Sequence, residues 1–270
     1  MSLRVCIAGA TGWVGRDLVR AVAAADDMRL VGAVARASAG QDIGTIVGTG
    51  ALGVQIAAKV EDALRDQIDV LVDYTKPLAV KAHTLGAIAA GVNVVIGTSG
   101  LAAADFAEID AAARSQGVGV IAAGNFSLTA TLMQRFALMA AALIPDVEVI
   151  DYAGASKPDV PSGTARELAE RLGEVRAGEP TALPAASLHG PRETRGAAIG
   201  GIPVHSLRAP GYVLSCEAIF GLPDERLSIR HDAGNGAGPY VGGTLLAIRR
   251  VKGRIGLTRG LDSLLFGDAR

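Results

Sequence analysis

This chain of 270 residues has few cysteines, no long apolar run and no large surplus of either charge. Its two cysteines, Cys6 and Cys216, are far apart and lie in apolar segments, which favours reduced thiols over a disulfide framework. The sequence shows no signal-peptide hydrophobic region and no run of about 18 apolar residues, so neither export nor a membrane span is expected. We therefore predict a soluble, cytoplasmic protein.

The charge balance and the histidines exclude further classes of partner. With 26 basic and 27 acidic residues the net charge is -1, which gives no global reason to expect nucleic acid or an anionic membrane as partner. No metal-ligand spacing joins the four histidines, which are His83, His189, His205 and His231. We therefore predict no metal, and a small molecule as the partner.

A strand, a glycine turn and a helix are predicted at the start of the chain. Leu3 to Ala8 is a short apolar run, and a helical pattern follows Gly12. Gly9, Gly12 and Gly15 are spaced three apart, a variant of the dinucleotide-binding fingerprint. The position of these glycines, between a first strand and a helix and before a second strand at 29–34, strengthens the prediction of a nicotinamide dinucleotide site.

The end of the second predicted strand indicates which nicotinamide cofactor binds. NAD-specific folds usually have a carboxylate there, whereas this chain reads Ala35-Arg36-Ala37-Ser38. Arg36 is well placed to pair with a 2'-phosphate, and Ser38 is a further possible donor. The alternative is an ordinary solvated arginine. We predict NADPH as cofactor, with NADH possible.

Beyond a glycine-rich stretch at 40–60, which we interpret as irregular, strands and helices alternate. The predicted helices are 60–65, 78–90 and 103–116, and the predicted strands are 69–73, 93–96 and 119–122. Such repeats build a doubly wound parallel sheet of the Rossmann type, with ligands at the carboxyl ends of its strands. The loops that follow these strands, 73–77, 97–100 and 124–127, are therefore candidate ligand contacts.

The stretch Lys157-Pro158-Asp159-Val160-Pro161-Ser162-Gly163-Thr164-Ala165 precedes a further helical pattern. A lysine charge, two hydroxyl side chains and the amides of a helix N-terminus together favour an anion-binding seat. The alternative is an ordinary capped helix start, with Ser162 or Thr164 as the cap.

Together these segments resemble the dihydrodipicolinate reductase family, also named 4-hydroxy-tetrahydrodipicolinate reductase, the nicotinamide-dependent enzymes of bacterial lysine biosynthesis. The matching segments run through nearly the whole chain: residues 9–15, 73–77, 95–100, 125–127, 157–165 and 205–208. Among them the Lys-x-Asp-x-Pro-Ser-Gly-Thr-Ala string is the most specific to the family.

The resemblance implies an α/β protein with two domains. A dinucleotide-binding domain would comprise residues 1–126 and 236–270, and a smaller α+β domain with a mixed sheet, residues 127–235, would bind substrate and form a homotetramer. It also implies that Gly97 and Thr98 lie near the nicotinamide and that Phe126 packs beside its ring. The predicted cofactor contacts are Gly9, Thr11, Gly12, Trp13, Val14, Gly15, Arg36, Tyr74, Thr75, Lys76, Gly97, Thr98, Asn125 and Phe126. The predicted substrate contacts are Thr98, Lys157, Ser162, Gly163 and Thr164, with Lys157 as the catalytic residue.

The chain departs from the family at chemically important positions. Family members have two adjacent histidines shortly before the lysine, where this chain reads Ala153-Gly154. An arginine that members often carry after the last strand of the second domain is missing from 231–236. Because each lost partner leaves a desolvated substrate carboxylate less well paired, a less polar or monoanionic substrate becomes plausible.

We predict from the sequence an enzyme, an NADPH-dependent reductase of a C=N or conjugated C=C bond. Its expected substrate differs from the lysine-pathway intermediate. Genuine reduction of that intermediate is one alternative, and a catalytically silent NADPH-binding regulatory protein is another.

Overall fold

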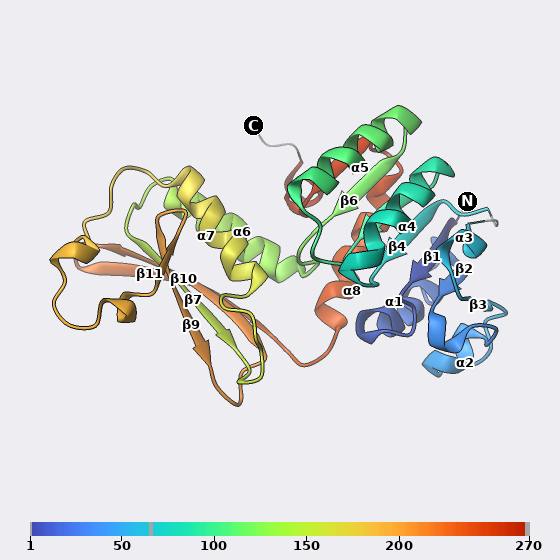
Figure 1. Ribbon diagram of the computed structural model, residues 1–270, viewed down its shortest axis with the longest axis horizontal. Coiled ribbons are helices and arrows are strands. Elements are labelled where there is room, and N and C mark those ends of the chain that lie inside the picture. The colour runs from blue at the N-terminus through green and yellow to red at the C-terminus, as the bar shows by residue number, and fades with distance from the viewer. Residues whose placement is uncertain (1, 65–66, 268–270) are drawn as a thin grey trace. The chain divides into compact units, whose positions relative to one another are not determined.

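The computed structural model describes residues 2–64 and 67–267, which form two compact units (Figure 1). The first unit ends at Leu128 and resumes at Ala237, and the second comprises Thr129–Gly236. The sequence leads us to expect divisions at 126/127 and 235/236. Cys6 in the first unit and Cys216 in the second are both buried, and neither is part of a disulfide.

The first unit contains a parallel sheet with the strand order β12-β6-β5-β4-β1-β2-β3. Its described strands are β1 (Leu3–Ala8), β2 (Met28–Val34), β3 (Ile56–Ala57), β4 (Val70–Asp73), β5 (Asn93–Ile96), β6 (Gly119–Ala122) and β12 (Gly256–Arg259). The central strands are continuous apolar runs, as expected for a parallel sheet covered on both faces. The predicted doubly wound α/β fold is confirmed.

Helices cover both faces of this sheet. One face packs against α1 (Trp13–Ala23) and α8 (Gly238–Val251), and the other against α4 (Pro77–Ala89) and α5 (Ala103–Gln116). The shorter helices of the unit are η1 (Arg36–Ser38), α2 (Ile43–Val47), α3 (Val60–Ala63) and α9 (Asp262–Phe266). Because helices cover both faces, the loops that follow the strands lie at the carboxyl edge of the sheet. The strand order reverses between β1 and β4, which is where ligands bind in such sheets.

The second unit contains a mixed sheet, as the family resemblance implies. Its order is β11-β10-β7-β9-β8, with β7 and β9 parallel and the other pairs antiparallel. These strands are β7 (Val147–Ala153), β8 (Ala197–Ile199), β9 (Ile202–Arg208), β10 (Leu214–Leu222) and β11 (Glu225–Ala233). Burial alternates along β7, so that Val149 and Asp151 face the helices while Ile150 and Tyr152 face away.

Two long helices, α6 (Leu128–Ala141) and α7 (Gly163–Val175), pack side by side on one face of this second sheet (Figure 1). Residues Met133 and Ala137 of α6 and Leu168 and Leu172 of α7 are buried in one cluster. Two single-turn helices, η2 (Ala185–Ser187) and η3 (Arg192–Arg195), lie in the long connection to β8. The packing fixes the start of α7 above the end of β7.

The interpretation of residues 40–60 as wholly irregular is wrong. Asp42 caps α2 by accepting a hydrogen bond from the Thr45 amide, and Gly48 ends it with a positive φ of 82°. A second oxygen of Asp42 accepts from the Val54 amide, which draws the following loop back toward β3. The predicted helix at 60–65 is shorter, Val60–Ala63, and its predicted last residue, Arg65, lies outside the described residues.

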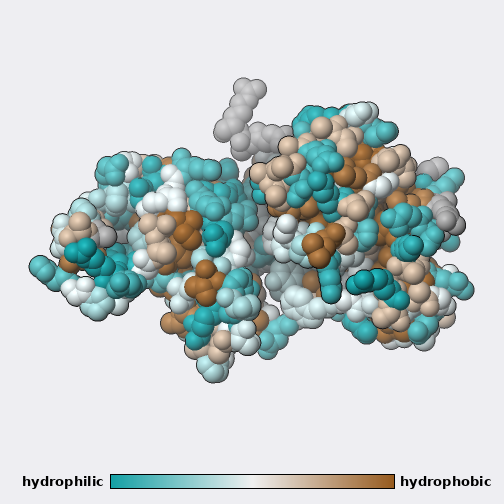
Figure 2. All heavy atoms as spheres, in the orientation of Figure 1, coloured by the Kyte–Doolittle hydropathy of each residue, from teal (hydrophilic) through white to brown (hydrophobic). Residues whose placement is uncertain are grey.

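No helix within residues 2–64 and 67–267 has both the length and the apolar character needed to cross a membrane. On the face drawn in Figure 2, hydrophobic residues are interspersed with hydrophilic ones. The buried apolar side chains are gathered in clusters on the two faces of the first sheet and under α6 and α7, while some large ones, among them Leu78 and Leu143, are exposed.

Candidate functional site

The glycine turn after β1 lies where the strand order of the first sheet reverses. Gly9 has a φ of 81°, and an added Cβ there would lie 2.4 Å from the Tyr74 carbonyl oxygen at the end of β4. A Cβ at Gly15 would lie 2.1 Å from the Gly9 carbonyl oxygen, so α1 can start this close to β1 only with glycine. Gly12 is the N-cap of α1 and supplies no side-chain cap, and the first turn carries no acidic residue.

The start of α1 therefore fits a phosphate-containing cofactor. Its first amides have no side-chain cap, and the exposed Gly12 allows a ligand to approach the backbone. Trp13, with 60% of its surface exposed, packs edge-on against Tyr240 with the ring centroids 5.7 Å apart. The Thr11 carbonyl is occupied by the Arg16 guanidinium, and Val14 is half-buried.

Arg36 follows β2 at the same edge of the sheet, as the first residue of η1. Its side chain is exposed and has no hydrogen-bonding or ion-pair partner among the described residues. Ser38, two residues further on, is half-buried in the same turn. The guanidinium is therefore free to bind a phosphate.

Asp73 organises the two loops that follow β4 and β5. This fully buried carboxylate accepts hydrogen bonds from the Thr75 amide at 2.8 Å and the Thr75 hydroxyl at 2.6 Å. It also accepts from the Thr98 hydroxyl at 3.0 Å, and its second oxygen lies 2.8 Å from Nδ1 of His83 on α4. Two predicted contact residues, Thr75 and Thr98, are thus held by one carboxylate.

Two of the three predicted aromatic contacts, Tyr74 and Phe126, pack in or against the core of the first unit, whereas Trp13 is exposed. Tyr74 hydrogen-bonds Thr244 at 2.8 Å, and its ring lies against the backbone of Gly97 and 6.1 Å from the Phe126 ring. Burial raises the pKa of Tyr74 above its ordinary value, so its hydroxyl stays protonated. Phe126 is 1% exposed. These rings support the backbone of the loops around Gly97.

Lys76 and Asn125 occupy the remaining predicted positions in the first unit. Lys76 is an exposed residue at the N-terminus of α4. The Asn125 side chain accepts a hydrogen bond from the Ser127 amide at 2.8 Å, which makes a tight turn between β6 and α6. The loops after β1, β4, β5 and β6 therefore share the carboxyl edge of the first sheet.

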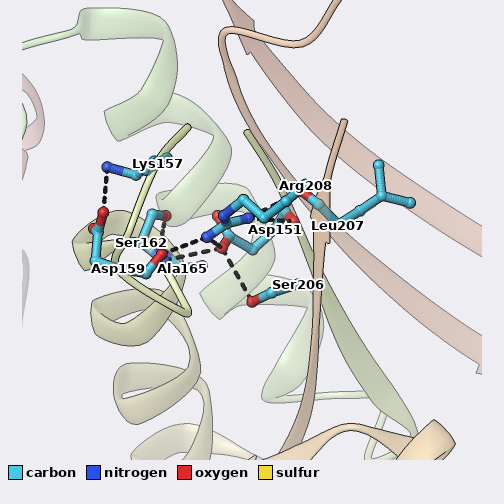
Figure 3. Close-up of polar contacts among 8 residues, drawn as sticks. All are labelled: Asp151, Lys157, Asp159, Ser162, Ala165, Ser206, Leu207 and Arg208. Atoms are coloured by element: carbon cyan, nitrogen blue, oxygen red, sulfur yellow. Dashed lines mark hydrogen bonds and ion pairs between the residues drawn. The ribbon is translucent and has the colours of Figure 1, made fainter. Parts of the chain in front are cut away.

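In the second unit, the predicted seat is the start of α7. Ser162 is its N-cap, with the hydroxyl accepting from the Ala165 amide at 3.3 Å (Figure 3). Gly163 is exposed, and an added Cβ there would meet no atom within 4 Å. Thr164 follows in the first turn, half-buried. The capped helix start, the alternative interpretation of this stretch, is present with Ser162 as the cap, and the open space beside the first amides of α7 also fits a bound anion.

Asp151 ties this seat to the sheet. Its Oδ2 accepts from the Ser162 amide at 2.9 Å, from Nη2 of Arg208 at 2.7 Å and from the Ser206 hydroxyl at 3.2 Å (Figure 3). Burial disfavours its charge, but the hydrogen bonds from Ser162 and Arg208 outweigh burial and lower the pKa of Asp151. The carboxylate is therefore charged at neutral pH.

Lys157 lies in the loop between β7 and α7, with its ammonium 2.8 Å from Asp159 (Figure 3). The hydrogen bond from Lys157 lowers the pKa of Asp159. An ammonium has three donor hydrogens, so this pair leaves donors for a ligand. Ala153 is fully buried and Gly154 half-buried, and neither has a side chain able to transfer a proton.

From the sequence we singled out segments 73–77 and 205–208 but assigned no role to the residues that position the loops: Asp73, His83, Asp151, Ser206 and Arg208. Asp73 did have a local signal, because Asp-x-Thr after a strand favours a side-chain turn onto the following backbone. Asp151 stood out as an acid on the apolar face of a strand. No short-range signal links Asp151 to Arg208, because the two are 57 residues apart.

Comparison with known proteins finds matches over nearly the whole chain. Residues 3–126 match the family model described as dihydrodipicolinate reductase, N-terminus, and residues 129–265 match the corresponding C-terminus model. The chain is 39% identical to the 4-hydroxy-tetrahydrodipicolinate reductase of Desulfitobacterium hafniense, over 97% of this chain and 98% of the relative. It is 38% identical to that of Synechococcus elongatus, over 97% and 98%.

A solved structure supports the same assignment. The dipicolinate-bound dihydrodipicolinate reductase from Paenisporosarcina sp. TG-14 matches with a TM-score of 0.81 and 32% identity, over 97% of this chain and 99% of that one. An amine dehydrogenase from Mycobacterium smegmatis, 16% identical with a TM-score of 0.66 over 96% and 95%, shares the fold. The chain belongs to the dihydrodipicolinate reductase family of NAD(P)H-dependent oxidoreductases.

Proposed function

We propose that the protein is an NADPH-dependent reductase of 4-hydroxy-tetrahydrodipicolinate, the substrate named for its relatives. The observation that carries the proposal is the seat from Lys157 to Thr164 at the start of α7, within a chain whose similarity to these reductases covers nearly its whole length. From the sequence we expected a substrate different from the lysine-pathway intermediate. The relatives favour the alternative, and nothing in them supports a different substrate.

The start of α7 would bind a carboxylate of the substrate. Ser162 uses its own side chain to cap the Ala165 amide, which leaves the amides of Gly163 and Thr164 and the Thr164 hydroxyl for the ligand. The open space beside Gly163 admits such a group. Dipicolinate, the ligand of the Paenisporosarcina enzyme, is a dicarboxylate, so its binding to this protein can be measured to test this role.

Lys157 would supply the proton. When bound, the nicotinamide supplies a hydride, which adds to one end of a C=N or conjugated C=C bond and leaves negative charge at the other end. The Lys157 ammonium would donate a proton to that atom, and its pairing with Asp159 holds it at the loop beside the seat. With Ala153 and Gly154 at the positions of the family's histidines, these two residues contribute no proton donor.

A second candidate function is reduction of a smaller or monoanionic cyclic imine. The observation that favours it is the apolar pair Ala153-Gly154, where the family places two histidines. Each lost donor removes a partner for a substrate carboxylate. A substrate with one carboxylate would need fewer such partners.

The cofactor and the assembly are part of the same proposal. The free Arg36 guanidinium favours NADPH over NADH, because it offers a partner for the 2'-phosphate. We also propose a cytoplasmic homotetramer assembled through the second unit, on the strength of the family resemblance. Light scattering of the purified protein measures the assembly.

The test is a direct assay beside an authentic relative, such as the Desulfitobacterium reductase. We expect oxidation of NADPH that depends on 4-hydroxy-tetrahydrodipicolinate, with kcat/KM within about a hundredfold of the relative's. Failure with this substrate but turnover of a monocarboxylate imine would favour the second candidate. Cofactor binding without turnover of any imine or enone would favour a silent regulatory protein.

A further inference from the structure

Arg208 and Asp151 form a buried ion pair behind the seat at the start of α7. Asp151 is fully buried and the Arg208 side chain is 14% exposed. We propose that Arg208 is a positioning residue, which holds the segment from Asp159 to Ser162 so that the first amides of α7 form a carboxylate seat. We call this arrangement, in which Arg208 and Asp151 hold the segment from Asp159 to Ser162, the clamp. The identity of the ligand rests on the proposed function, whereas the clamp is a property of this chain alone.

A single nitrogen of Arg208 joins the strand to the loop. Its Nη2 donates to Asp151 Oδ2 at 2.7 Å and to the Asp159 carbonyl oxygen at 2.7 Å (Figure 3). The same Asp151 oxygen accepts from the Ser162 amide at 2.9 Å. A continuous set of bonds therefore runs from β9, through the side chain of β7, to the N-cap of α7.

The loop between β7 and α7 is thus held at two points. Asp159 is bound by its carbonyl in the middle of the loop, and Ser162 by its amide at the end. Ser206, two residues before Arg208 on the same face of β9, adds a third donor to the carboxylate at 3.2 Å. Leu207, between them, points away from this cluster (Figure 3). The alternation of β9 therefore aims both polar side chains at Asp151.

The charges show why Arg208 acts through geometry. Its guanidinium is paired with Asp151, and the Lys157 ammonium is paired with Asp159, so the cluster carries no surplus positive charge. A substrate anion gains little direct attraction from Arg208. Without Arg208, however, the Asp159 carbonyl loses its anchor and Asp151 becomes an unpaired buried charge. The first amides of α7 would then lose their fixed direction.

The experiment compares Arg208→Gln and Arg208→Lys with the matched control Arg195→Gln. Arg195 also pairs with a carboxylate of β7, Glu148, but on the opposite face of the sheet. Hydrogen exchange of the peptide covering residues 157–166 measures the seat without any ligand. Calorimetry with dipicolinate and with NADPH, and steady-state kinetics, measure binding and turnover on the folded proteins.

In Arg208→Gln we expect exchange at 157–166 to increase, dipicolinate affinity to fall about tenfold or more, and KM to rise by a similar factor. We expect the NADPH affinity and kcat to change less than about threefold, since the first unit is not altered and the ion pair of Lys157 with the Asp159 carboxylate does not use the Arg208 side chain. Arg208→Lys, which keeps the charge, should recover part of the affinity. Arg195→Gln should leave all five quantities unchanged.

One result would overturn the proposed role of Arg208. Unchanged exchange at 157–166 and unchanged dipicolinate affinity in a folded Arg208→Gln protein would reduce Arg208 to a stabilising residue. If that variant does not fold, Asp151→Asn combined with Arg208→Gln removes both charges and replaces it in the same measurements. If the wild type neither binds dipicolinate nor reduces the proposed substrate, the proposed function fails, and the exchange data alone decide the clamp.

Discussion

Two buried carboxylates, one in each unit, hold the loops of the candidate site in different ways. Asp73 at the end of β4 is satisfied by a backbone amide, two hydroxyls and an imidazole. Asp151 on β7 accepts at Oδ2 from a guanidinium, a hydroxyl and the amide of the N-cap residue of α7, whereas its buried Oδ1 has no partner among the described residues. The first arrangement fixes loops through polar side chains, and the second relies on an ion pair.

The difference follows from what each loop must do. The loops around Asp73 present backbone and threonine hydroxyls, for which short local hydrogen bonds are sufficient. The loop between β7 and α7 must hold the N-terminus of α7 against β7. The long side chain of Arg208, which is 57 residues from Asp151 in sequence, reaches both the Asp151 carboxylate on β7 and the Asp159 carbonyl in the loop. Buried ion pairs are costly to break because removal of one partner leaves a charge without compensation. The second unit should therefore tolerate substitution less well.

The largest effect is expected for Lys157→Ala, which should separate the two units functionally. If the ammonium is the proton donor, turnover should fall by about a hundredfold to ten-thousandfold. NADPH affinity should stay nearly unchanged, because Lys157 belongs to the second unit and the predicted cofactor contacts to the first. Single-turnover rates on folded, NADPH-saturated protein measure the chemical step.

Lys157→Met is the control, since it keeps the apolar stem and removes the charge. It should match alanine if charge is the cause, and be milder if packing is. A rate within threefold of wild type would show that Lys157 serves only to pair with Asp159.

The second prediction compares the loss of stability when each buried carboxylate is replaced. Asp151→Asn leaves the Arg208 guanidinium buried without its counter-ion, so the free energy of unfolding should fall by about 3–5 kcal/mol. Asp73→Asn keeps a carbonyl acceptor and should cost about 1–3 kcal/mol. Urea unfolding of both variants measures the difference, with the exposed Asp26→Asn as control. Equal losses, or a larger loss at Asp73, would contradict the contrast drawn between the units.

How far the sequence predicts this molecule depends on the range of the interactions. The parallel sheet, its helices and the N-cap of α7 follow from local patterns, because apolar runs, glycine turns and Ser-Gly-Thr each determine their own backbone. Even α2 had its signals, an Asp42 cap and a Gly48 stop, within the stretch interpreted as irregular.

The supports of the site could not be predicted in the same way. The partners of Tyr74 and Asp151 come from segments distant in sequence, Thr244 and Arg208. Only the register of β7 against β9, with Asp151 beside Ser206, brings the carboxylate to its donors. Tyr74 and Phe126, both predicted to touch the cofactor, pack in or against the core for the same reason, because tertiary packing decides which face of a loop is buried.

The third prediction concerns the first unit alone. Arg36→Ala should reduce the preference for NADPH over NADH by about tenfold or more, since a guanidinium–phosphate pair is worth about 1.5–3 kcal/mol. The dipicolinate affinity should not change, because the variant leaves the second unit intact. Calorimetric titration of both cofactors measures the ratio. Equal affinities for the two cofactors in the wild type would remove the assigned role of Arg36.

The smallest effect is expected in the pH dependence of stability, where the ion pair of Asp151 should be visible. The pKa of Asp151 is lowered in the folded protein, because the hydrogen bonds from Ser162 and Arg208 outweigh burial. A carboxyl with a lowered folded pKa contributes stability above its unfolded pKa of about 4 and loses it as the pH falls through the folded value. Urea unfolding of wild type and Asp151→Asn from pH 7 to pH 2.5 should therefore give a difference in the free energy of unfolding that is constant above about pH 5. This difference should shrink below pH 4, where protonated Asp151 resembles asparagine.

Asp69→Asn is the matched control, since Arg4 lowers the pKa of Asp69 to about 2 at a site distant in sequence from the seat. The difference in unfolding free energy between wild type and Asp69→Asn should shrink over a similar pH window, without any change in dipicolinate binding. A difference for Asp151→Asn that persists undiminished to pH 2.5 would mean that shape, not charge, makes this carboxylate necessary.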